Sequence, residues 1–192
     1  MKKFDWSGVQ AQDDDFAQPT PGGYICRIMD IQDVPEKQYV KVFFDIVDGE
    51  WKGFYSNRRE RFGIEFPIMY RSYNESNERA RGMFKGFLKA LEESNRNFVA
   101  DKFDCNEQQL KGMFIGIIMG EEEYVNKNGE LRISLKAVKC CSGPKIRKGE
   151  FKVPELKKLP ANTTAQKVSQ PAQQAAQQSF GTNVPFDDEC PF

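Results

Sequence analysis

One segment of this chain has helical periodicity, and its place between two groups of strand-like segments constrains the fold. Over residues 77–93 apolar side chains recur every three or four positions: Ala80, Met83, Phe84, Phe87, Leu88 and Leu91. This spacing places them along one stripe of an amphipathic α-helix. With a single long helix, the chain must build most of its core from strands.

The segments before the helix alternate between apolar and polar residues, as strands do. Strands are predicted over 24–32 and 38–47, and after the turn at Asp48-Gly49-Glu50 a third is predicted over 54–62. In the second strand one face carries Val40, Val42, Phe44 and Ile46. The other face carries Tyr39, Lys41 and Phe43.

Two further strands are predicted after the helix, over 112–124 and 130–141. The Asn128-Gly129 pair between them indicates a hairpin, because both central residues of a type I′ turn need positive φ. In the last strand the residues expected to face inward are Leu131, Ile133, Leu135 and Ala137. Gly112, Gly116 and Gly120 share one face of the preceding strand, where they permit the bending of a small barrel.

The resulting order, β-β-β-α-β-β, is the connectivity of the OB-fold, a five-stranded Greek-key barrel. We therefore expect a mainly β, OB-fold-like domain with a disordered C-terminal tail. An unrelated α+β sheet with one packed helix would give the same order of elements.

Composition divides the chain of 192 residues into four parts. An N-terminal arm covers 1–20, the barrel 21–150, a basic segment and linker 151–183, and a tip 184–192. Residues 161–183 contain six Gln and five Ala and few large apolar groups, so we expect them to be disordered.

The formal net charge is zero, from 28 basic and 28 acidic residues, but the charges are separated along the chain. The first 20 residues hold 2 basic and 4 acidic groups, and residues 161–192 hold 1 and 3. The remaining body, with 25 basic and 21 acidic groups, carries a charge of +4. Neutrality is thus the sum of a basic body and acidic ends.

Catalytic chemistry has little support in the sequence. The chain has no histidine, which excludes Ser-His-Asp and Cys-His nucleophile pairs and histidine-bound zinc or iron. The acidic triplets at 13–15 and 121–123 suit a metal poorly, because consecutive strand residues alternate faces. We expect no enzyme activity, cofactor or metal, although a nuclease that binds metal through Asp and Glu alone stays open.

The compartment is predicted from the cysteines and the N-terminus. Five irregularly spaced cysteines suggest free thiols in a reducing cytoplasm, such as that of a bacterial host cell. Met1-Lys2-Lys3 is followed by Phe4-Asp5-Trp6-Ser7, which lacks the apolar stretch of a signal peptide, and no membrane span is predicted.

Aromatic and basic residues are interleaved on the predicted second and third strands, and this mixture suits single-stranded nucleic acid. Bases stack on aromatic rings, while Lys and Arg track the phosphates. Together with the loops 33–37 and 125–129, these strands form the usual ligand face of an OB-fold. The candidate DNA-binding residues are Tyr39, Lys41, Phe43, Trp51, Tyr55, Arg58, Arg59, Arg61, Arg71, Tyr73, Lys127, Arg132 and Lys136.

A basic segment from Lys136 to Lys158 could extend this phosphate path. It holds eight Lys or Arg against Glu150 and Glu155. A segment of this kind is also typical of an ordinary solvated border.

The last residues, Asp187-Asp188-Glu189-Cys190-Pro191-Phe192, resemble the acidic tip of bacterial single-stranded-DNA-binding proteins. The resemblance implies that Phe192 anchors in an apolar pocket of partner enzymes and that Pro191 shapes the turn. It also implies that Asp187, Asp188 and Glu189 meet a basic rim on the partner. Cys190 departs from the usual isoleucine.

The body resembles phage- or prophage-encoded single-stranded-DNA-binding proteins, through Phe4-Asp5-Trp6 and Pro21-Gly22-Gly23-Tyr24. The resemblance implies a protein that coats single strands in phage DNA replication, recombination and repair and recruits enzymes through its tip. Homo-oligomers are compatible with this function, and no membrane partner is expected. Alternatives are a strand-annealing accessory protein and a protein-only adaptor on an OB-like scaffold.

Overall fold

The structure is a computed structural model, and it describes residues 3, 5, 7 and 17–160. The linker predicted over 161–183 and the tip over 184–192 lie outside the described residues. Along the described chain the elements are β1 (Gly22–Val34), η1 (Pro35–Lys37), β2 (Tyr39–Ile46), α1 (Phe54–Phe62), β3 (Ile68–Ser72), α2 (Glu78–Ser94), η2 (Ala100–Lys102), η3 (Glu107–Leu110), β4 (Phe114–Val125), β5 (Leu131–Cys141) and α3 (Gly143–Arg147).

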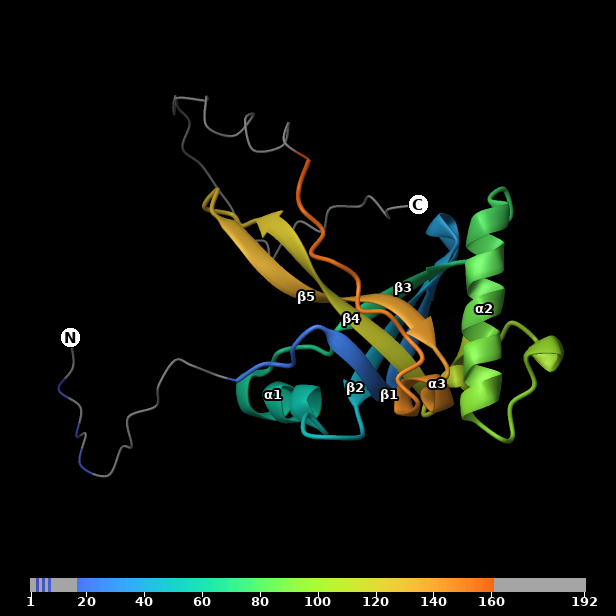
Figure 1. The fold of residues 1–192 in the computed structure, drawn as a ribbon, viewed down its shortest axis with the longest axis horizontal. Coiled ribbons are helices and arrows are strands. Elements are labelled where there is room, and N and C mark those ends of the chain that lie inside the picture. Colours follow the sequence, from blue (N-terminus) through green and yellow to red (C-terminus); the bar gives the residue numbers. More distant parts are fainter. Residues whose placement is uncertain (1–2, 4, 6, 8–16, 161–192) are drawn as a thin grey trace.

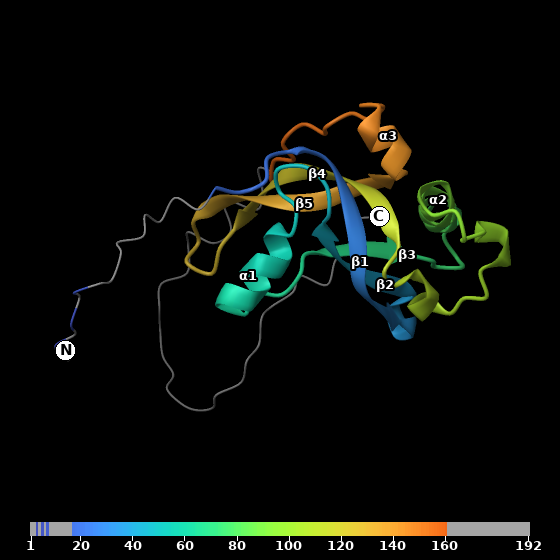
Figure 2. The same cartoon turned by 90° about the horizontal axis from the view of Figure 1, so that it is seen from below.

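The five strands form one antiparallel sheet in the order β3-β2-β1-β4-β5 (Figure 1). The edge strands β3 and β5 approach each other, but within the described residues no ladder of hydrogen bonds joins them. The sheet is therefore curved and open. Helices α1 and α2 lie at opposite ends of it, and α3 lies over β1 and β4 on the side away from β3 (Figure 2).

The core lies on the inner face of the sheet, as the strand alternation predicts. In β2, the side chains of Val40, Val42, Phe44 and Ile46 are all buried. They pair with inner residues of the neighbouring strands, for example Val42 with Met69 and Phe44 with Ile28. Burial of such aliphatic and aromatic side chains, at roughly 1.5–3 kcal/mol each, is the main stabilising contribution to the fold.

The predicted helix is confirmed as α2. Asn77 caps its N-terminus, because the Asn77 side chain accepts a hydrogen bond from the Ala80 amide. The buried stripe consists of Ala80, Phe87, Ala90 and Leu91. Met83, which the spacing assigned to the same stripe, is exposed.

The strand predicted over 54–62 is wrong, because these residues form helix α1. The helix is bounded by Gly53 and Gly63, which both have positive φ, and the Gly63 amide closes the last turn on the Arg59 carbonyl. Its N-terminus is capped from a distance by the buried carboxylate of Asp45. The third strand is instead the short β3, which begins at Ile68, six residues after the end of the predicted segment at Phe62.

The closing hairpin is confirmed, but two details of its prediction are wrong. Leu131 and Ile133 were expected to face the core, yet they are 53% and 56% exposed, since the hairpin projects beyond the body (Figure 1). The turn is also not type I′, because only Gly129 has positive φ. The Asn126 side chain organises it instead, by accepting hydrogen bonds from the Asn128 and Glu130 amides.

Two of the three glycines predicted to share a strand face, Gly116 and Gly120, lie in β4 and contact the chain that follows β5. The prediction is wrong for Gly112, which precedes β4 and has positive φ. A Cβ on Gly116 would lie 2.5 Å from Ile146, and one on Gly120 would lie 2.6 Å from Pro154. Beyond them, Lys157 pairs in parallel with Glu122 of β4 through hydrogen bonds to the neighbouring backbone. The residues up to 160 thus pack on the body, although the sequence assigned 151–160 to the linker segment.

Candidate nucleic-acid interface

The aromatic and basic candidate residues of β2 lie together on the outer face of β2 and β3. Tyr39, Lys41 and Phe43 are half-buried there, opposite the core residues of the same strand. In the register with β3, Lys41 faces Tyr70 and Phe43 faces Ile68. We call the surface formed by these five side chains the β2–β3 face.

Tyr70 joins this face although it was not among the candidate residues. Its ring makes an edge-on contact with the ring of Tyr39, with 5.5 Å between centroids and 78° between planes. Such pairs hold both rings in a defined orientation. In the structure Tyr70 alternates with the buried residues Met69 and Arg71, which places its ring on the outer face.

Arg71 and Tyr73 do not reach the β2–β3 face. Arg71 lies opposite Val40 on the inner side of the sheet, is 7% exposed, and donates a hydrogen bond to the Tyr70 carbonyl. Tyr73 packs edge-on against Phe84 of α2, and its hydroxyl donates to Asp33 Oδ1 at 2.6 Å. Burial and this hydrogen bond raise the pKa of Tyr73 to about 12. Both residues therefore have structural partners.

Trp51 and Tyr55 likewise belong to the packing between α1 and the core. The Trp51 ring lies edge-on to Phe54 at 5.5 Å, and the Tyr55 ring lies edge-on to Phe44 at 6.1 Å. The Tyr55 hydroxyl donates to Met119 Sδ at 3.7 Å, on the inner side of β4. Burial raises the pKa of Tyr55 well above its ordinary value. Both rings therefore have packing partners within the body.

The arginine cluster lies on α1 rather than on a strand. Arg58 lies over the Phe54 ring at 5.5 Å, and Arg59 lies over the ring of Phe66 at 5.0 Å. Arg61 is exposed in the last turn. Because Phe66 and Pro67 lead directly into β3, Arg59 lies near the end of the β2–β3 face where Phe43 and Ile68 lie.

The three basic candidates of the β4–β5 hairpin lie on its exposed surface. Lys127 is in the turn, and Lys136 is opposite Gly120 on β5. Arg132 contacts Glu130 Oε2 at 2.8 Å, and this carboxylate offsets its charge. The hairpin and the η1 turn between β1 and β2 project from the same side of the body and diverge (Figure 1).

Four of the eight basic side chains in the segment 136–158 form ion pairs, and these pairs reduce the positive charge that the segment presents to a ligand. Those pairs are Lys145 with Glu93, Arg147 with Asp48, Lys148 with Glu150, and Lys157 with Glu122. Exposed pairs of this kind contribute little stability and are screened by salt. The segment is therefore a weaker candidate for a phosphate path than the β2–β3 face.

The acidic triplet of β4 contacts the chain that follows β5. Glu122 pairs with Lys157 at 2.6 Å, and Glu123 Oε2 accepts a hydrogen bond from the Leu159 amide at 3.1 Å. No group of three or more metal-binding side chains is found in the described part of the chain. No helix among the same residues is long and apolar enough to cross a membrane.

The partner-binding candidates Asp187, Asp188, Glu189, Pro191 and Phe192 lie outside the described residues. In comparisons with known proteins, no family model and no curated sequence matches the chain. The candidate interface therefore stands on the geometry of the β2–β3 face.

Proposed function

We propose that this chain binds single-stranded DNA on the β2–β3 face of an OB-fold-like domain. The chain would coat and protect single strands in phage DNA replication, recombination and repair. It would recruit partner enzymes through the tip 184–192. The observation that carries the proposal is the gathering of Tyr39, Phe43 and Tyr70 around Lys41 on one surface.

The strand order supports the OB-like assignment. In β3-β2-β1-β4-β5 the third and fifth strands are at opposite edges, and these edges approach each other. Joining them would close a five-stranded Greek-key barrel, with the β2–β3 face and the two projecting hairpins around the ligand. One departure is the additional helix α1, which is inserted between β2 and β3.

Binding on this face would combine stacking and charge. Bases stack on Tyr39, Phe43 and Tyr70, each worth about 1–3 kcal/mol, and every base offers a π-face, so sequence preference is weak. Lys41 contributes a phosphate contact at the centre, and Arg59 and Arg61 contribute others at the margin. The proposal is one of binding alone and includes no bond-making or bond-breaking step.

The experiment is a titration of the full chain with a dT oligonucleotide at about 50 and 200 mM salt, followed by intrinsic fluorescence. We expect binding that weakens steeply with salt, because phosphate contacts release counterions. Absence of binding at the lower salt would contradict the proposal.

A protein-only adaptor is the second candidate, because Leu131 and Ile133 expose apolar surface on the projecting hairpin. The same titration separates the two functions. An adaptor would leave the fluorescence unchanged at both salt concentrations, whereas a single-strand binder would not. Adding the complementary oligonucleotide to the bound complex would show whether the chain also anneals strands.

A further inference from the structure

The outer surface continues from β2 onto β1, where a β-bulge interrupts the pairing of these two strands. Ile28 pairs with Phe44 and Asp30 with Phe43, so that Met29 is the additional residue. A bulge bends its strand and changes the direction of nearby side chains. This bulge lies directly beside Phe43 of the β2–β3 face.

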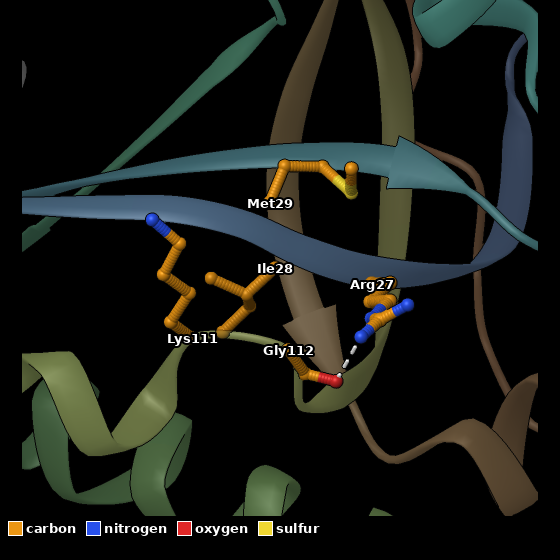
Figure 3. Close-up of a pocket in the computed structure, with 5 residues that line it drawn as sticks. All are labelled: Arg27, Ile28, Met29, Lys111 and Gly112. Carbon is orange, nitrogen blue, oxygen red and sulfur yellow. Dashed lines mark hydrogen bonds between the residues drawn. The ribbon is translucent and has the colours of Figure 1, made fainter.

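A shallow pocket of about 170 Å³ lies at the bulge (Figure 3). One side is formed by Arg27, Ile28 and Met29 of β1. The other is formed by Lys111 and Gly112, in the segment that leads into β4. The Gly112 amide donates to the Ile28 carbonyl at 2.8 Å, which holds that segment against β1. Two basic side chains from distant parts of the sequence are thus brought to one pocket.

The two basic groups are held differently. Arg27 Nε donates to the Gly112 carbonyl at 3.2 Å, which fixes the guanidinium at the pocket and uses one of its five N–H groups (Figure 3). Lys111 Nζ contacts Asp30 Oδ1 at 2.9 Å, and both side chains are substantially exposed, at 52% and 41%. Two cations thus line the pocket, and the Asp30 carboxylate beside it offsets the charge of Lys111.

We propose that this pocket binds a phosphate group of the single strand, with Arg27 as its principal ligand and Lys111 as the second. The proposal rests on the proposed function, because the strand must first lie on the β2–β3 face. Phosphate suits the pocket because a fixed guanidinium presents parallel N–H groups to two of its oxygens.

The register places this subsite at the end of a path across the sheet. Lys41 pairs with Gln32 on β1, and Arg27 is five positions from Gln32, with the extra residue Met29 between them. At about 3.3 Å per residue, Lys41 and Arg27 are therefore roughly 15 Å apart along the strands. A strand that crosses from Tyr70 over Phe43 therefore reaches the pocket next.

Asp30 limits the affinity of the subsite. Its carboxylate competes with phosphate for Lys111 and repels the incoming anion. Removing its charge should therefore strengthen DNA binding, which is an effect that a destabilised protein would not produce.

The test compares Arg27→Gln, Asp30→Asn and the control Lys102→Gln in the dT titration. Lys102 is exposed and belongs to η2, which contacts α2. We expect Arg27→Gln to weaken binding roughly three- to tenfold at low salt and to reduce the salt slope by about 0.7, the value for one phosphate. We expect Asp30→Asn to tighten binding about two- to fivefold and Lys102→Gln to change neither quantity.

Failure of the phosphate subsite can be distinguished from failure of the proposed function. If wild-type protein does not bind dT, the proposed function fails. If wild-type protein binds while Arg27→Gln and Asp30→Asn match it in affinity and salt slope, the subsite is overturned and the function stands. NMR of the Arg27 Nε–H group separates the sources of phosphate: dT should shift this resonance far more than inorganic phosphate at equal phosphate concentration. Equal shifts would overturn the assignment to the strand.

Discussion

At the scale of single residues, Asp45 explains a local structure that the sequence pattern did not indicate. It is 3% exposed, and its Oδ1 accepts hydrogen bonds from the Ile46 and Tyr55 amides at 2.8 and 3.0 Å. Its Oδ2 accepts from the Ser56 amide at 3.2 Å and from the Ser56 hydroxyl. A carboxylate at this position satisfies the free amides of the helix and interacts favourably with its dipole.

We predict that Asp45→Ala lowers the free energy of unfolding by about 2–3 kcal/mol, because buried donors would lose their acceptor. Denaturant titration measures the change. Asp48→Ala is the matched control, since Asp48 is exposed and its ion pair with Arg147 spans 3.6 Å. We expect the control to stay within about 0.5 kcal/mol of wild type. A loss at Asp48 as large as that at Asp45 would contradict the capping role.

Tyr73 gives the fold a pH dependence at high pH. Its folded pKa, raised to about 12 from an ordinary value of 10.0, means that folding favours the protonated phenol. The stabilisation is fully present below pH 10 and is lost as the pH rises through 12. We predict that Tyr73→Phe lowers the free energy of unfolding by about 0.5–1.5 kcal/mol at neutral pH, because the hydrogen bond to Asp33 is lost.

Denaturant titrations of both proteins at increasing pH test this assignment. The difference between wild type and Tyr73→Phe should shrink above pH 10 and change sign before the pH reaches about 12, because ionising the Tyr73 hydroxyl destabilises the wild type alone. A difference that is constant across this range would show that the Tyr73 hydroxyl has no such role.

At the scale of elements, the strands were predictable where one face is buried and the other is not. The alternation in β2 identifies both its core residues and its outer residues, because a half-buried strand imposes a period of two. Leu131 and Ile133 continue the same alternation into the projecting hairpin, where no core remains to cover them. Periodicity therefore predicts the face of a strand, but not how far the core extends along it.

Helix α1 could not be found from periodicity, because its stabilising contact is distant in the sequence. Asp45 is ten residues from Tyr55, and aromatic residues such as Phe54 favour strands over helices. Gly53 and Gly63 were the available signals, at the two ends of the segment. Because residues 54–62 were predicted as a strand, Tyr55 and the three arginines were placed on the wrong kind of element.

The packing of α3 and the chain after it depends on glycine at two positions of β4. At Gly116 a Cβ would lie 2.5 Å from Ile146 and 2.9 Å from the Ser142 carbonyl. We predict that Gly116→Ala destabilises the protein by roughly 1–3 kcal/mol, because backbone must move to admit the methyl group.

Gly82→Ala on α2 is the control, and its expected change in stability has the opposite sign. Outside the backbone of its own helix and its chain neighbours, no atom lies within 4 Å of a Cβ built there, and alanine favours a helix over glycine by about 0.5–1 kcal/mol. Denaturant titration should show Gly116→Ala less stable, and Gly82→Ala more stable, than wild type. Destabilisation of both to the same extent would contradict the packing argument.

At the scale of the whole molecule, the separation of charge along the sequence suggests competition between the tip and DNA. The acidic residues Asp187, Asp188 and Glu189 are joined to a basic body by a long segment. We predict that deleting 184–192 tightens dT binding roughly two- to tenfold at low salt and abolishes recruitment of partner enzymes. A shuffled tip of the same charge is the control: it should restore competition but not recruitment. Unchanged affinity in the deletion would contradict the competition.

The central claim is that single-stranded DNA lies on the β2–β3 face, and photo-cross-linking of a dT oligonucleotide to the full chain tests it most directly. Mass spectrometry of the digested complex identifies the linked residues. Because the stacking rings lie closest to the bases, we predict cross-links at Tyr39, Phe43 and Tyr70. Cross-links confined to α2, α3 or the projecting hairpin, with none on these three rings, would contradict the account.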